Sequence, residues 1–101
     1  MDSLIKAINQ YPNGTRLIVE WPNGCTVLGE IDTIYDADDE EETGENYHVI
    51  YVCVFHVIDI LGHSTEKEHF EKGDLIEISM KAPPLRVLTV NGKVVWRNTK
   101  G

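Results

Sequence analysis

The sequence predicts a mainly β fold: a small antiparallel barrel of five to six strands with an N-terminal helix and one short inserted helix. Two ten-residue blocks, 11–20 and 21–30, each run from an aromatic residue through Pro-Asn-Gly and β-favouring residues to Glu, so a turn falls every ten residues. Asn91-Gly92 separates two β-favouring segments and predicts a two-residue type I′ hairpin turn. Residues 47–60 are nearly all strand formers and would span about 45 Å if straight. In a domain with a radius of gyration of about 13 Å, they must bend or split.

The first elements follow from local signals. Residues 3–10 suit a short helix with Asp2 or Ser3 as N-cap, and Pro12 prevents its continuation. Residues 16–21 alternate between apolar and polar side chains, which indicates a half-buried strand.

Residues 25–35 predict the next strand, with Val27, Ile31 and Tyr35 facing inward. Gly29 interrupts this strand. A glycine in such a position is typical of a bulge or of the bend at a barrel corner.

The middle strand is apolar on both faces. Only one face can point into a barrel, so the other needs cover from the N-terminal helix or from a second copy of the chain. This requirement predicts a homo-oligomer. One face carries Val49, Tyr51, Cys53 and Phe55, and the other carries Ile50, Val52 and Val54.

The inserted helix is expected within residues 63–73. Thr65 and Glu68 form a capping box there, and Gly73 ends the helix. Residues 74–81 alternate again and predict another strand.

A helix followed by Gly14, an alternating strand, Asn23-Gly24 and then Gly29 resembles the first conserved motif of the Sm-like family. The resemblance covers residues 14–36. It implies an Sm-like or SH3-like barrel of five strands, with ring-forming strand edges and an RNA-binding loop.

The RNA-binding part of that family pattern is absent. Asp36-Ala37-Asp38-Asp39-Glu40 replaces the expected aspartate-to-asparagine loop, and residues 81–84 (Lys-Ala-Pro-Pro) stand where the second motif has an Arg-Gly pair. We therefore carry over the architecture and none of the binding residues.

The composition predicts one domain over residues 1–101, large enough for a core without disulfides or a metal. Two cysteines are too few for a disulfide framework, and the N-terminus lacks the profile of an export signal. The longest apolar run, residues 49–55, is far shorter than the roughly 18 residues of a membrane span. We expect a cytoplasmic protein with no membrane partner.

The formal charge of −8 comes mostly from an acidic loop predicted over residues 36–46, which has seven acids within ten residues. The rest of the chain has 10 acids against 9 bases. The acidic loop fails the calcium-loop template, because neither possible frame has the central Gly or the final Glu. We interpret it as a solvated loop. The more specific alternative is a surface that binds a basic partner.

No spacing supports an enzyme, and we expect no cofactor or metal. His48 and His56 lie about 26 Å apart on an extended strand. His63, Glu66 and His69 lack a fourth ligand. Cys53 and His56 are expected on opposite faces of their strand, which separates the thiolate from the imidazole. We therefore interpret each cysteine as a small buried hydrophobic residue.

The last hairpin is basic and places Trp96 as a core residue of its second arm. With Arg86, Lys93 and Arg97 beside this aromatic ring, it could bind RNA or DNA. The charges are few, however, and solvation of the outer strand faces explains them as well.

These observations predict a non-enzymatic, self-associating protein-interaction module with an unknown protein partner. The alternative is a nucleic-acid-associated protein, which binds RNA or DNA through the basic hairpin or imitates nucleic acid toward a basic protein through the acidic loop. Nucleic acid is the less favoured partner. The candidate interaction residues are Asp38, Asp39, Glu40, Glu41, Glu42, Ile50, Val52, Val54, Arg86, Lys93 and Arg97.

Overall fold

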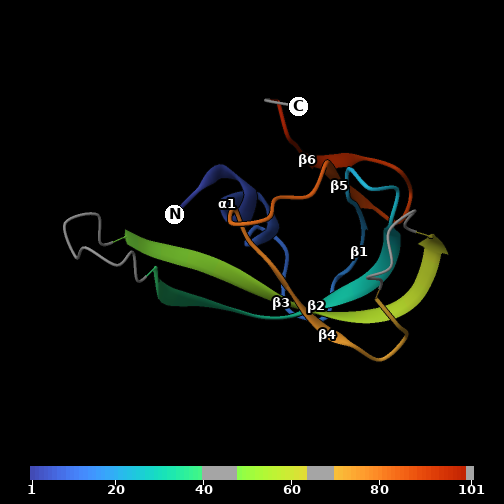
Figure 1. The fold of residues 1–101 in the computed structure, drawn as a ribbon, viewed down its shortest axis with the longest axis horizontal. Helices are drawn as coiled ribbons and strands as arrows, with labels where there is room; N and C mark the ends of the chain where they lie inside the picture. The colour runs from blue at the N-terminus through green and yellow to red at the C-terminus, as the bar shows by residue number, and fades with distance from the viewer. Residues whose placement is uncertain (40–47, 64–69, 100–101) are drawn as a thin grey trace.

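The computed structural model describes residues 1–39, 48–63 and 70–99, apart from the side chains of Asp38, Asp39 and His48. These residues form one short helix and six strands (Figure 1). The elements are α1 (Ser3–Ile8), β1 (Arg16–Glu20), β2 (Thr26–Asp39), β3 (His48–Gly62), β4 (Leu75–Ile78), β5 (Arg86–Thr89) and β6 (Val94–Arg97).

The six strands make one antiparallel sheet in the order β4-β3-β2-β1-β5-β6. Its end strands, β4 and β6, do not pair with each other, so the predicted barrel is wrong. A barrel needs its first and last strands to pair. Here β3 neither splits nor joins a second sheet. It curves along β2, and the two strands run past the body of the molecule as a long ribbon (Figure 1).

α1 confirms the predicted N-terminal helix in a shorter form. The Asp2 carboxylate accepts a hydrogen bond from the Ile5 amide at 2.9 Å, which satisfies one of the free N–H groups of the first turn. The helix packs its apolar side onto the sheet through Leu4, Ile5 and Ile8, all of which are buried.

Gly29 lies at a bulge, as predicted. The pairing register shifts between Leu28 and Gly29, and the glycine packs against β3. A Cβ there would lie 2.5 Å from the carbonyl oxygen of His56 and would overlap the ring of Phe55. Any larger residue would therefore push the two strands apart.

The core lies between α1 and one face of the sheet, which we call the core face. As predicted, Leu17, Val19, Val27 and Ile31 point into it. Tyr35 does not, and the prediction for this residue is wrong. A second bulge, between Ile31 and Thr33, shifts the alternation of β2 and turns Tyr35 to the opposite face, where it is 38% exposed.

The last hairpin forms as predicted, but its turn is not type I′. Type I′ requires positive φ at both central residues, and of the two only Gly92 has it, at +91°. The loop is longer, and the Thr89 amide donates to the Lys93 carbonyl across it. Trp96 is only half-buried. Its indole N–H donates to the Ser3 hydroxyl at 3.0 Å, which ties β6 to α1.

The capping box predicted for the inserted helix, Thr65 and Glu68, lies outside the described residues. In the described part of that segment, Gly73 has a φ of +90° and makes a turn before β4. α1 is the only helix among the residues that the structure describes.

Candidate protein-binding surface

The distal half of the β2–β3 ribbon has no flanking strand in the described structure. β1 pairs with β2 only over Thr26–Glu30, and β4 pairs with β3 only over Cys53–His56. We call the part beyond them, residues 32–39 of β2 and 48–52 of β3, the arm. It projects away from the body of the molecule (Figure 1). β2 and β3 extend into the region predicted as the acidic loop, because Asp36 to Asp39 belong to β2.

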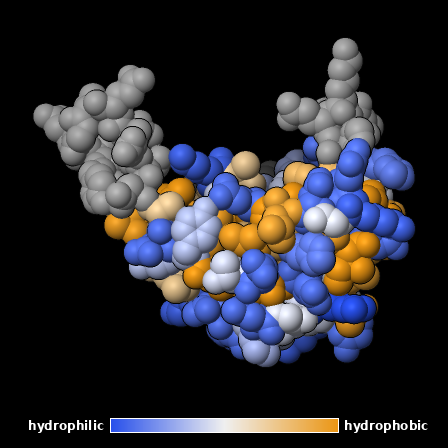
Figure 2. Space-filling model, turned by 90° about the horizontal axis from the view of Figure 1, so that it is seen from below, coloured by the Kyte–Doolittle hydropathy of each residue, from blue (hydrophilic) through white to orange (hydrophobic). Residues whose placement is uncertain are grey.

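The face of the arm that points away from the core is apolar in its centre. We call this side of the sheet the outer face. Tyr35 pairs with Val52 and Ala37 pairs with Ile50, so all four lie on it. Figure 2 views the molecule from below and shows apolar surface broken up by polar side chains.

One hydrogen bond crosses this outer face. The Tyr35 hydroxyl donates to the Glu77 carboxylate at 2.6 Å, from β2 to β4 over the intervening strand β3. This bond to Glu77 raises the pKa of Tyr35. Val52 pairs with Tyr35 on this face and is only 4% exposed.

The sequence predicted that α1 or a second copy of the chain would cover the second apolar face of β3, and the structure differs. α1 lies on the core face, beside Cys53 and Phe55, and on the outer face Val52 is already buried within the single chain. A partner that approaches this face would touch the ring of Tyr35 rather than Val52. Of the three aliphatic candidates, Ile50 and Val54 remain partly exposed.

The arm, together with the sequence between its two strands, is the most acidic part of the chain. Residues 32–51 contain eight acids and neither Lys nor Arg. Asp32 and Asp36 are exposed. Of the acidic candidates, Asp38 and Asp39 lie on β2 with side chains outside the described set, and Glu40, Glu41 and Glu42 lie outside the described residues altogether.

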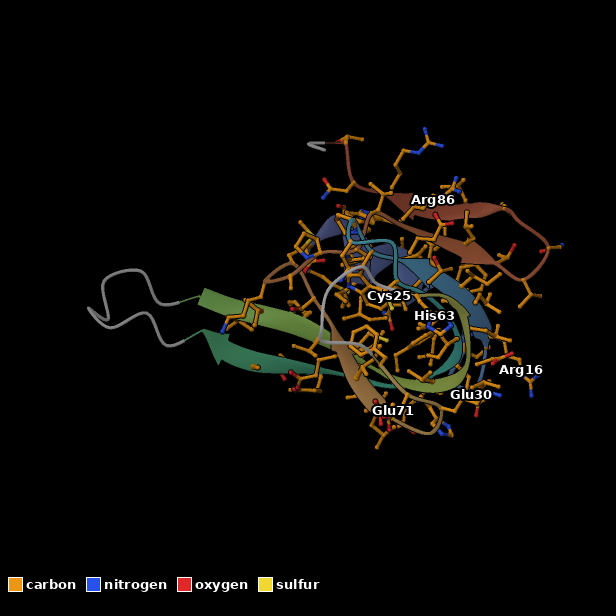
Figure 3. All side chains as sticks on the ribbon, turned by 45° about the vertical axis from the view of Figure 1, so that its right-hand side comes forward. Arg16, Cys25, Glu30, His63, Glu71 and Arg86 are labelled. Carbon is orange, nitrogen blue, oxygen red and sulfur yellow. The ribbon has the colours of Figure 1, made fainter. Side chains whose placement is uncertain are left out.

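The basic candidates lie at the other end of the sheet (Figure 3). Arg86 forms a two-pronged ion pair with Glu20 on β1, and its Nη2 donates at 3.2 Å. This hydrogen bond raises the pKa of Arg86. Arg97 faces Arg86 across the hairpin, and Lys93 lies in its turn. Because Glu20 neutralises Arg86, the basic hairpin offers less charge than the sequence suggests.

Neither cysteine is a candidate nucleophile. Burial, and secondly the charge of Asp32, raises the pKa of Cys53 to about 12. Burial also raises the pKa of Cys25, and a hydrogen bond from the backbone of Phe70 lowers it by a smaller amount. Both thiols are free and stay protonated at neutral pH, which confirms their reading as small buried hydrophobes.

Within residues 1–39, 48–63 and 70–99, no three His, Cys, Asp or Glu side chains lie close enough to hold a metal ion. The trio of His63, Glu66 and His69, which the sequence argued against as a metal site, is not tested by this, because Glu66 and His69 lie outside the described residues. No described helix is long and apolar enough to cross a membrane.

A family model described as "Cognate immunity protein YxxD" matches residues 1–100. The chain belongs to this family. It is therefore a non-enzymatic immunity protein, as the lack of a catalytic arrangement predicted. No curated protein and no solved structure matches the chain.

The family assignment overturns the Sm-like resemblance. Gly14 and Gly24, at φ of +91° and +94°, are explained by the two turns they occupy, and Gly29 by its close contact with β3. An open sheet needs these glycines as much as a barrel does. The spacing therefore described local turn geometry and carried no information about the family.

Sequence reasoning also missed Tyr35 and Glu77 as surface residues. No local signal identifies them, because their contact depends on a bulge in β2 and on the pairing of β4 with β3. The negative charge beside Tyr35 was visible in the sequence from the start.

Proposed function

We propose that this immunity protein binds its cognate toxin through the arm and thereby neutralises it. One observation supports this most directly: the arm combines an exposed aromatic ring, partly exposed aliphatic side chains and dense negative charge. Tyr35 and Val49 lie outside the core cluster and are 38% and 47% exposed, so their side chains are available to a partner.

The arm has the two components expected of a protein interface. Aromatic anchors near the centre of an interface carry much of the binding energy, and Tyr35 is held in place by Glu77 before any partner arrives. Surrounding charges accelerate encounter with a partner of opposite sign. The toxin surface that fits the arm is therefore basic around an apolar centre. The cytoplasmic location expected from the sequence is where we place this encounter.

Nucleic-acid binding by the basic hairpin is the weaker candidate function. Arg86 is already paired with Glu20, which leaves Arg97 and Lys93 as its candidate phosphate contacts. Self-association stays a prediction, which sedimentation velocity at high micromolar concentration tests. Of the residues that suggested self-association, Val52 supports it least, because this side chain is already buried within the single chain.

A titration of the purified chain with its cognate toxin tests the proposal. We compare wild type with Asp36→Lys in the arm and with Glu71→Lys, an exposed residue on the body of the molecule, well away from the arm (Figure 3). Both substitutions change the charge equally. We expect Asp36→Lys to weaken binding about tenfold or more and to reduce its salt dependence, because a cation then faces the basic toxin. Glu71→Lys should bind like wild type.

Protection of toxin-producing cells is measured with the same three proteins. If Asp36→Lys binds and protects like wild type, the arm is not the binding surface. If the wild-type chain neither binds nor protects, the proposed function itself is wrong.

A further inference from the structure

The arm has an unpaired strand edge along β2. The last contacts of β2 with the β1 side are made by Ile31, whose amide donates to the Thr15 carbonyl at 3.0 Å and whose carbonyl accepts from the Gly14 amide at 2.6 Å. From Asp32 to Asp39 no described strand lies on that side, while on the other side Thr33 to Asp39 are paired with β3. Within the arm, this edge is longer than the free edge of β3, which covers residues 48–52.

Such an edge readily accepts another strand, and soluble proteins protect it with charge, proline or bulges. This one starts at a bulge and carries the exposed acids Asp32 and Asp36. If two copies paired along this edge, each would bring the four acids Asp32, Asp36, Asp38 and Asp39 and no Lys or Arg. Like charges directly opposite one another destabilise strand pairing. The edge is therefore protected against its own copy, whereas a basic strand would be attracted to it.

We infer that a cationic strand of the cognate toxin adds to the free edge of β2, so that the sheet of the immunity protein continues into the toxin. This inference rests on the proposed function and specifies its mode of recognition. The eight edge residues span about 26 Å, which is longer than a typical strand of five to six residues.

The register of the arm defines the chemistry of the added strand. Ile34 and Asp36 share one face of β2, and Tyr35 and Ala37 share the other. Side chains of a paired strand alternate in the same way. Lys or Arg at every second position of the toxin strand would lie beside Asp36, and the intervening side chains would lie beside the ring of Tyr35.

Residue-resolved amide hydrogen exchange, on the free chain and on its complex with the toxin, tests the inference. In the free arm, β3 protects the amides of alternate residues between 32 and 39. In the complex we expect the other amides of this stretch to slow at least tenfold, because the toxin strand now bonds them. The open edge at β6, Val94–Arg97, serves as the matched control and should not change.

If the toxin binds but the arm amides exchange as in the free chain, strand addition is wrong while the proposed function stands. Protection at β6 in place of β2 would overturn the inference in the same way. If the wild-type chain does not bind toxin at all, the proposed function fails and the inference with it.

Sedimentation velocity tests the charge argument separately. Neutralising the edge with Asp32→Asn and Asp36→Asn should promote self-pairing, seen as a shift toward dimer at high micromolar concentration. The control Glu71→Gln should sediment like wild type. A wild-type dimer with protected β2 arm amides would assign the edge to a second copy and overturn the inference.

Discussion

The two halves of the β2–β3 ribbon share their strands but differ in what surrounds them. We call the other half, residues 26–31 of β2 and 53–62 of β3, the base. There β1 and β4 flank the ribbon and α1 covers its core face, so Phe55 is 1% exposed. Val49, six residues earlier on the same face of β3, lies in the arm and is 47% exposed. The comparison shows that one face of a strand can be fully buried at one end and largely exposed at the other.

Apolar character alone does not distinguish these halves. Residues 49–55 are apolar throughout, and the alternation of faces is the same at Val49 and Phe55. The acids of β2 do distinguish them, because Asp32, Asp36, Asp38 and Asp39 lie in the arm, whereas Glu30 is the one acid of β2 in the base. Charge on β2 therefore marks the part of the ribbon that no described strand flanks.

The largest expected effect comes from truncating the same face in both halves. Phe55→Ala should reduce the free energy of unfolding by about 3–5 kcal/mol, because it leaves a cavity in the core. Val49→Ala should change it by less than about 0.5 kcal/mol, because its side chain lies in the open arm. Urea unfolding of the two variants measures the difference. Equal losses would mean that the arm is part of the core after all.

A smaller effect is expected at the bulge that shapes the base. Gly29→Ala should reduce the free energy of unfolding by about 1–3 kcal/mol, because the new Cβ meets the Phe55 ring and the His56 carbonyl. Adding Phe55→Leu to this variant should cost less than Phe55→Leu alone, because the smaller side chain relieves the overlap. Strictly additive losses in urea unfolding would show that the close contact is not the cause.

The smallest effect concerns the pH dependence of stability at the border of base and arm. The pKa of Cys53 rises to about 12 in the folded chain from an ordinary value of 9.0, so the unfolded chain loses this proton first as the pH rises. The stabilisation is complete below pH 9 and is lost progressively toward pH 12. Between pH 8 and 10.5, the stability of Cys53→Ala should therefore fall less steeply than that of wild type. Parallel curves from chemical unfolding would contradict the shift.

The elements that depend on neighbouring residues could be predicted from the sequence. The Asp2-capped helix, the turns at Gly14 and Gly24, the strands and the bulge at Gly29 all formed where turn chemistry and alternation indicated. These features are set by a few residues each, so one sequence contains enough information to place them.

Features that depend on distant pairing were not predictable. Barrel closure would need contacts between β4 and β6, and nothing in either segment specifies or forbids them. The bulge after Ile31 reversed the expected direction of Tyr35, and no glycine marks it. For the candidate surface, the sequence indicated its charge and its aliphatic residues but not the aromatic ring that joins them.

The contacts that close the body connect opposite ends of the chain. Arg86 reaches Glu20 from 66 positions away, and Trp96 reaches Ser3 from 93 positions away. Contacts over such separations form late, because the intervening chain must first be brought into place. During synthesis on the ribosome, the arm hairpin can pair early, whereas the body waits until β5 and β6 have emerged.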